Sequence, residues 1–402
     1  MKIGRGVEGN TPYGGGTNEN PGEECRAIDN RPYESEERAK MRRKVGGLDS
    51  FPTKDYNNMK IQKARMIAML LAPKLKKGDT IAVFSPSTPA TATAPKRYAR
   101  AKAFLEDKGF RIIEGSLTGK RDFYRSGTIA ERAEEFNELI RNPEVKCIIS
   151  AIGGTVSNSM LPYLDYEQLR KTPKIIMGYS DVTALLLGIY AQTGLVTYYG
   201  PAVVASFGEF PPYSDMAFDY FWSVVSGEAA APYTLPTPEF WSDEMIFWER
   251  QDRSKTQMPN ELVTVSGGQA QGRVIGGNLN TMSGIWGSPY IPEIRQGDIL
   301  LIEDCMKEVA TIERSFSMLK LNGIFDRIGG LILGKHELFK DMDTDRKPYE
   351  VLLEVLGGVP EFPLLAEFDC CHTHPMLTMP LGTEVLLDAT AQTVTPLRPW
   401  IG

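Results

Sequence analysis

The chain has 402 residues, which is more than one hydrophobic core usually fills, so its length predicts two domains. Hydrophobic residues make up 42% and charged residues 24% of the composition, which is typical of a globular protein. The formal net charge of -6 gives no basic field to hold a phosphate backbone or an anionic lipid surface. Nucleic acid and membranes are therefore disfavoured as partners, and a small molecule or peptide is favoured.

Residues 1–68 are rich in Gly, Pro, Asn and charges of both signs, and they contain few large apolar side chains. Such a segment buries too little surface to offset the entropy lost on ordering, so we expect a disordered leader. The five cysteines are an odd number, and no secretory hydrophobic segment is recognisable near the start. Both features favour a reducing compartment, so we expect a cytoplasmic protein.

Residues 69–228 show an alternation of short apolar runs with helical patterns. Strands are expected at 80–84, 110–114, 146–151, 175–178 and 196–199, and helices at 96–108, 130–141 and after the turn at 179–183. Alternating strands and helices are typical of a parallel α/β sheet. We therefore expect an N-terminal α/β domain over this range.

The pattern changes after residue 228. Residues 229–261 have no sustained period but contain Trp241 and Trp248, which indicates an ordered aromatic loop or interdomain linker. Residues 262–402 are predicted to form a second, β-rich domain. Its expected elements are strands at 262–265, 299–302 and 384–388 and a helix at 312–321.

Ser180 lies between a predicted buried strand and a predicted apolar helix, in the segment Gly178-Tyr-Ser-Asp-Val-Thr183. A serine on such a sharp turn exposes its hydroxyl, and the following helix N-terminus directs N–H groups towards a developing oxyanion. The segment resembles the G-x-S-x-G nucleophile turn but lacks its second glycine. A serine that merely caps the helix is the alternative reading.

Gly153 and Gly154 follow another predicted strand, so they are expected at the same carboxyl edge of the sheet as Ser180. There Gly154 can lend a backbone N–H to an oxyanion. A glycine turn needed only for chain reversal explains the pair equally well.

The three histidines are His336, His372 and His374, and these are the candidates for a general base. His372 and His374 stand beside Cys370 and Cys371, which leaves a metal cluster as an alternative. No second group of ligands with zinc-type spacing is present in the sequence, so no metal is expected.

Glu303 follows the apolar run that begins at Asp298, so a carboxylate is delivered at the end of a buried strand. A carboxylate is what an imidazole needs to fix its tautomer and to stabilise its charged form. An ordinary salt bridge to Lys307 or Arg314 is the alternative.

Several short motifs together resemble the serine peptidases that include the murein LD-carboxypeptidases, over roughly residues 72 to 400. These motifs are Gly153-Gly-Thr155, Gly178-Tyr-Ser-Asp-Val-Thr183, Gly276-Gly-Asn-Leu279, Leu301-Ile-Glu-Asp304, and His372 followed by Met379-Pro-Leu-Gly382. Within that family the chain is more similar to the microcin C immunity proteins. The segments that carry this likeness are Tyr163-Leu-Asp-Tyr166, Gly334-Lys-His-Glu-Leu-Phe339 and Cys371-His-Thr-His-Pro-Met376.

The resemblance implies a flavodoxin-like parallel sheet domain that bears Ser180 as nucleophile, and a smaller β-rich C-terminal domain that bears Glu303 and His372. It assigns His372 as the base and Glu303 as the group that orients it. The backbone N–H groups of Gly154 and Asp181 would form the oxyanion hole. The family likeness implies no cofactor, and we expect a homodimer.

The implied substrate is an aminoacyl or peptidyl nucleotide conjugate, because the microcin C immunity proteins cleave the amide that joins an aspartyl carbonyl to a modified adenylate. Trp241 or Trp248 would then stack on the purine, and Lys307 would meet the acidic side chain or the phosphate-like linker. The alternative for each tryptophan is that it only fills the core between the domains.

Two other functions stay open. A murein tetrapeptide LD-carboxypeptidase is the first, although the segment Ala151-Ile-Gly-Gly-Thr155 departs from the Arg-Gly-Gly-Tyr-Gly pattern of that branch. A binding protein that keeps this fold without turnover is the second.

Overall fold

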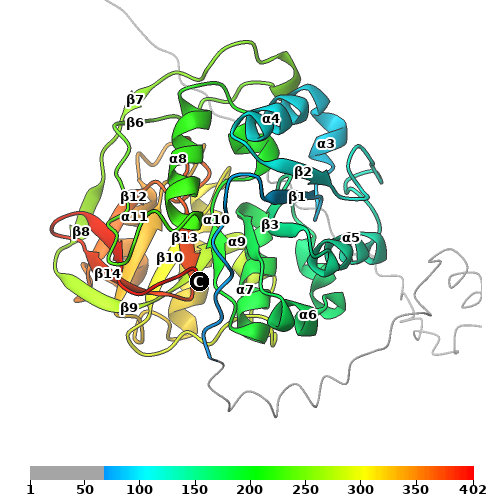
Figure 1. Cartoon of the computed structure of the whole chain (residues 1–402). Coiled ribbons are helices and arrows are strands. Elements are labelled where there is room, and N and C mark those ends of the chain that lie inside the picture. Colours follow the sequence, from blue (N-terminus) through cyan, green and yellow to red (C-terminus); the bar gives the residue numbers. More distant parts are fainter. Residues whose placement is uncertain (1–67) are drawn as a thin grey trace, which may run out of the picture. The chain divides into compact units, whose positions relative to one another are not determined.

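The computed structural model describes residues 68–402 (Figure 1). The predicted leader, 1–68, therefore lies outside the described residues except for its last one. The described chain builds two large sheets, and Figure 1 shows the first mainly in blue and green and the second in yellow to red.

The first sheet has six strands and follows the sequence-based prediction closely. Its strands are β1 (Thr80–Phe84), β2 (Arg111–Glu114), β3 (Val145–Ser150), β4 (Ile175–Gly178), β5 (Thr197–Tyr199) and β13 (Met379–Leu381). They lie in the order β13-β5-β4-β3-β1-β2, in which β13 is antiparallel and the other pairs are parallel. Without β13, this is the strand order of a flavodoxin-like sheet, so the predicted fold class is confirmed.

Helices connect the strands of this sheet. They are α3 (Ala90–Thr93), α4 (Pro95–Asp107), α5 (Ile129–Arg141), α6 (Tyr166–Lys171), α7 (Thr183–Thr193) and α8 (Tyr213–Val225). The start of α5 is fixed by a capping box, in which Thr128 and Glu131 bond each other's backbone N–H groups. In contrast, α7 is apolar on all sides and its first seven residues are buried, as expected for a helix enclosed by other elements.

The second sheet has seven strands with a parallel centre and antiparallel edges. Its strands are β8 (Val263–Ser266), β9 (Gln269–Asn278), β10 (Ile299–Glu303), β11 (Gly330–Gly334), β12 (Leu364–Phe368), β14 (Glu384–Asp388) and β15 (Thr393–Pro396). The order is β15-β14-β9-β10-β11-β12-β8, in which β9 to β12 are parallel. The accompanying helices are α9 (Leu279–Ser283), α10 (Val309–Leu321) and α11 (Pro348–Leu356).

The chain passes from the second sheet back to the first between β12 and β13. Strand β13 comes from the region predicted as the C-terminal domain, yet it pairs with β5 of the first sheet. The connection, residues 369–378, contains His372 and His374. A histidine-bearing loop is thus held at both ends, once by each sheet.

The segment 229–261 is ordered and contacts elements of both sheets. It contains the two-stranded sheet of β6 (Phe240–Trp241) and β7 (Met258–Pro259) and a 3₁₀ turn at Trp248–Arg250. Near its start, the Leu235 N–H donates to the carbonyl of Val394, a residue of β15. Further along, the Glu249 carboxylate accepts from the backbone N–H of Lys96 in α4 at 3.0 Å.

Candidate active site

Ser180 sits at the junction of β4 and a 3₁₀ turn, Ser180–Val182, that leads directly into α7. Its φ of 61° lies in the left-handed region, which a residue with a side chain rarely adopts. Such strain persists only where the surroundings enforce it, and it is concentrated at functional sites. The Ser180 N–H donates to the Tyr199 hydroxyl at 3.2 Å. The sharp turn predicted around this serine is therefore present.

The two glycines after β3 lie directly against this turn. A β-carbon on Gly153 would stand 3.1 Å from Ser180 Oγ and 3.0 Å from the Asp181 backbone nitrogen. Gly154 has a φ of 146°, and a β-carbon there would lie 2.3 Å from Ser87 Oγ. Side chains at either position would block this approach, so the pair does more than reverse the chain.

Polar contacts fix the glycine loop to the serine turn. The Asp181 carboxylate accepts from the backbone N–H groups of Val156 at 3.0 Å and Ser157 at 2.9 Å. The Ser87 hydroxyl, in the loop that follows β1, accepts from the Val156 N–H as well, at 3.1 Å. Burial raises the pKa of Asp181, and these hydrogen bonds oppose the rise. The backbone around Ser180 is therefore preorganised, as an oxyanion site requires.

Glu303 ends β10 and is fully buried. Its carboxylate accepts from Tyr199 Oη at 2.5 Å and from Asn278 Nδ2 at 3.1 Å, and it pairs with His372 Nδ1 at 2.6 Å. Burial alone would raise the pKa of Glu303, but the His372 charge and these hydrogen bonds together hold it below its ordinary value. The ionic partner of Glu303 is thus the histidine, not Lys307 or the arginine of α10.

His372 has its two ring nitrogens in different situations. Nδ1 faces Glu303, whereas Nε2 is buried and makes no hydrogen bond of standard geometry within residues 68–402; the Cys305 side chain is the other group that interacts with the ring. The ring packs edge-on against Tyr179, with centroids 4.8 Å apart. Burial opposes the charged ring, but the Glu303 carboxylate raises the pKa of His372 well above its usual value. A carboxylate-oriented imidazole is the arrangement of a general base.

The other two histidines lack such a carboxylate. His374 exchanges backbone hydrogen bonds with Ser242, and burial with the positive charges of Lys255 and Arg97 keeps its pKa well below the usual value. His336 pairs its Nδ1 with the Gly334 carbonyl, and burial lowers its pKa to about 4. Within the described part of the chain, no three His, Cys, Asp or Glu side chains are grouped as metal ligands.

The residues predicted to bind substrate each lie against a charged group. Lys307 is half-buried near Asp304, whose pKa burial raises to about 6 while the Lys307 charge opposes the rise. The Trp248 ring centroid is 4.9 Å from the Arg97 guanidinium, and the Trp241 centroid is 5.6 Å from Lys335 Nζ.

Tyr199 and Asn278 complete the surroundings of Glu303, and the sequence-based reasoning gave neither a role. Tyr199 ends the predicted strand at 196–199, so its place at the carboxyl edge of the sheet was the available signal. Asn278 lies in the Gly-Gly-Asn-Leu motif and caps α9, accepting from the Thr281 N–H at 3.0 Å while its Nδ2 reaches Glu303. One side chain therefore serves both a helix cap and the buried carboxylate.

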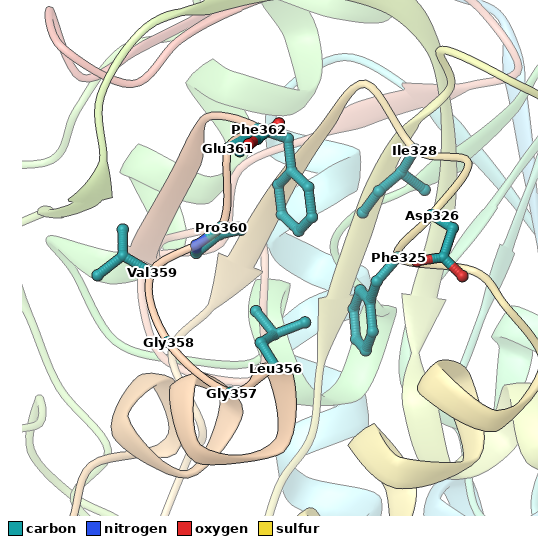
Figure 2. A pocket seen from close by; sticks show the side chains of 10 residues that line it. All are labelled: Phe325, Asp326, Ile328, Leu356, Gly357, Gly358, Val359, Pro360, Glu361 and Phe362. Atoms are coloured by element: carbon teal, nitrogen blue, oxygen red, sulfur yellow. The ribbon is translucent and has the colours of Figure 1, made fainter.

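A cavity of about 580 Å³ lies at one end of the second sheet (Figure 2). Phe325 and Ile328 precede β11, and Pro360 and Phe362 precede β12, so this cavity is at the amino ends of those strands. Glu303 is at the carboxyl end of the parallel neighbour β10. The cavity is consequently separate from the Ser180 site.

Two ranges of the chain match the two domains of a known family. The LD-carboxypeptidase N-terminal domain matches residues 81–200, and the LD-carboxypeptidase C-terminal domain matches residues 271–387. The chain therefore belongs to the LD-carboxypeptidase family of peptidases, as its sequence motifs predicted.

Curated relatives show the same relationship. The chain is 56% identical to the microcin C7 self-immunity protein of Escherichia coli, over 79% of this chain and 93% of that protein. It is 55% identical to a putative carboxypeptidase of Vibrio cholerae, over 83% of this chain and 99% of that protein.

A solved structure of the microcin C7 self-immunity protein in complex with aspartyl sulfamoyl adenosine is 54% identical and superposes with a TM-score of 0.81. The match covers 83% of this chain and 100% of that one. Among the described helices, none is both long and apolar enough to cross a membrane.

Proposed function

We propose that this protein is a serine-type amide hydrolase that cleaves aminoacyl or peptidyl nucleotide conjugates. Ser180 is the nucleophile, His372 the general base and Glu303 the group that orients the imidazole. The observation that carries the proposal is the buried Glu303 to His372 hydrogen bond of 2.6 Å, which engages Nδ1 and orients the ring. Tyr199 connects this pair to the serine turn, because its hydroxyl bonds both Glu303 and the Ser180 N–H.

The reaction proceeds by acyl transfer. Ser180 Oγ attacks the carbonyl carbon of the scissile amide while His372 Nε2 takes the hydroxyl proton. The N–H groups of Gly154 and Asp181 stabilise the negative oxygen of the tetrahedral intermediate. His372 then returns the proton to the leaving nitrogen, and the C–N bond breaks to give an ester on Ser180. Water attacks this ester with His372 again as base, which releases the acid and restores the serine.

The charge state of the pair fits this cycle. Glu303 favours the imidazolium that forms when His372 accepts the proton, since it holds the pKa of that ring high. Tyr199 and Asn278 satisfy the other carboxylate oxygen, so Glu303 stays ionised despite full burial. Both contacts act on the base through Glu303 and are positioning contacts.

The substrate class is proposed from the relative that has been solved with aspartyl sulfamoyl adenosine. In this chain, Trp248 supplies an aromatic face for the purine and Lys307 a positive charge for an acidic group. We further propose a cytoplasmic homodimer whose nucleophile domain covers 69–228 and whose second domain covers 262–402. The free thiols of Cys147, Cys370 and Cys371 support a reducing compartment.

Hydrolysis assays with two substrate classes test the proposal. The wild-type protein is expected to cleave aspartyl sulfamoyl adenosine, and Ser180→Ala is expected to abolish this activity while retaining binding. Release of D-alanine from a muropeptide, without cleavage of the nucleotide conjugate, would instead establish a murein carboxypeptidase. Binding of either compound without turnover would establish a binding protein.

A further inference from the structure

Lys255 is a buried lysine near the candidate site that has no partner for its charge. The residue is only 8% exposed, yet its ammonium group makes no hydrogen bond or salt bridge with any residue in the described range 68–402. Burial penalises the charged form of Lys255, and a ligand that supplies an acceptor would offset this penalty. By contrast, Lys335, which is equally enclosed, is paired with Asp369 at 2.7 Å.

The backbone on the C-terminal side of Lys255 is fixed against the histidine loop. Thr256 donates its N–H to Glu244 at 2.7 Å and accepts from the Tyr213 hydroxyl at 2.8 Å. The Tyr213 ring in turn packs against His374, with centroids 6.1 Å apart. Lys255 is therefore held beside the loop that carries both His374 and His372.

The nearby acidic groups do not neutralise Lys255 completely. Glu209 is bonded to Arg97 at 2.8 Å, and its other oxygen accepts from Gln251. Glu337 and Asp243 act on Lys255 only at a distance, beyond the range of an ion pair. Arg97 and the neutral His374 complete the charged and titratable groups that face Lys255. None of these carboxylates is in direct contact with Lys255, so its ammonium group is left without an ion pair.

The order of these groups matches the order of groups in a nucleotide conjugate. The Trp248 ring centroid is 4.9 Å from the Arg97 guanidinium. Thr256, next to Lys255, accepts from Tyr213, whose ring packs against His374, two residues from His372. In the substrate, a purine is followed by a ribose, an anionic phosphoryl linker and then the scissile amide. If the purine lies on Trp248, the linker reaches Lys255 before the amide reaches His372.

We propose that Lys255 is a specificity residue that binds the phosphoryl linker of the substrate, a role distinct from that of Lys307. Lys307 follows β10, whereas Lys255 belongs to the segment 229–261 and lies beside the histidine loop, so the two lysines come from different elements. Together they select a substrate with two anionic groups. This inference rests on the proposed nucleotide substrate, but its test needs no turnover.

The test compares adenosine monophosphate with adenosine by calorimetry, in the full chain carrying Ser180→Ala. Lys255→Met keeps the stem and removes the charge, so it is expected to weaken adenosine monophosphate binding by about 10- to 150-fold, the equivalent of one charge-assisted hydrogen bond. Adenosine binding should change less than threefold, and Lys255→Arg should retain most of the affinity for the monophosphate.

Thermal unfolding separates this role from a structural one. Removing an unpaired buried charge should leave the melting temperature of Lys255→Met unchanged or higher. Equal losses for adenosine and its monophosphate, or undiminished monophosphate binding in Lys255→Met, would overturn the inference. Failure of the wild-type protein to hydrolyse any conjugate, with the predicted binding pattern intact, would count against the proposed hydrolase alone.

Discussion

Replacing Glu303 by glutamine removes the negative charge beside His372 while keeping the size of the side chain. The amide oxygen can still accept from Tyr199 and Asn278, which places the amide NH₂ opposite His372 Nδ1. Nδ1 must then accept, so the proton moves to Nε2 and the imidazole can no longer act as base in that tautomer. An incorrect tautomer at the histidine of a triad costs up to about 10⁴-fold in kcat.

The same substitution changes the pH dependence. The Glu303 carboxylate stabilises the charged imidazolium at hydrogen-bond distance, so its removal acts directly on the protonation of His372. Because the carboxylate raises the pKa of His372, its loss must lower that pKa. The base works only when neutral, so wild-type activity falls as the pH drops through the His372 pKa. The residual activity of Glu303→Gln should fall only at a distinctly lower pH.

The assay is kcat/KM for aspartyl sulfamoyl adenosine between pH 5 and 9, with Asp304→Asn as the matched control. Asp304 is the adjacent carboxylate, it also accepts from Asn278, and it makes no hydrogen bond to His372. In the profile of kcat/KM against pH, the control should shift the fall at low pH much less than Glu303→Gln does. If the fall in kcat/KM at low pH stayed in place or moved to higher pH in Glu303→Gln, or moved equally in both variants, the claim that the Glu303 charge raises the pKa of His372 would be refuted.

Two further predictions follow from the same contacts. Ser180→Ala and His372→Ala should each lower kcat by about 10³-fold or more. The double variant should lose little beyond either one, because the members of a triad act as a unit. Additive losses in kcat would show that the two residues do not act as one unit. Trp248→Ala should lower kcat/KM for the adenosine conjugate by about 5- to 150-fold and leave kcat/KM for a substrate without the purine unchanged. Trp241 lies next to the buried Lys335, so Trp241→Ala should mainly lower the melting temperature. Equal losses on both substrates for Trp248→Ala would make that ring structural.

The sequence predicted the first sheet well because its strands are short, buried apolar runs. Strand β1, Thr80–Phe84, is buried along its whole length and was predicted with the same bounds. The turn at Ser180 was also predictable, since Gly178 ends an apolar run and a long apolar helix begins a few residues later. In such segments the local pattern and the burial agree.

Other elements carry no clear local pattern. Helix α8, Tyr213–Val225, is rich in Tyr, Phe and Trp, which have only moderate helix propensity, so tertiary packing decides its structure. Strand β9, Gln269–Asn278, is largely exposed in its first half and ends with two glycines at positive φ, which favours a loop assignment. The pairing of β13 with β5 is a long-range contact that no local pattern specifies.

Some residues of the candidate site were predicted from the sequence, and others were not. Ser180, Glu303 and His372 were identified as candidates from the ends of predicted elements and from the family motifs, and the structure brings the last two into direct contact. No role was predicted for Tyr199 and Lys255, because their environment depends on segments distant in sequence. The Tyr199 hydroxyl bonds the Glu303 carboxylate, which belongs to the other sheet. Lys255 lies in a segment without a periodic pattern, so its burial could not be predicted from its neighbours in sequence.

Covalent labelling with a fluorophosphonate, followed by peptide mapping, tests the central claim most directly. Such a reagent reacts only with a serine that an adjacent base has activated. Stoichiometric modification of Ser180 in the wild-type protein, lost in His372→Ala and retained in His374→Ala, is the predicted result. Labelling at another residue, or equal labelling of Ser180 with and without the His372 imidazole, would contradict the assignment of this serine and histidine as nucleophile and base.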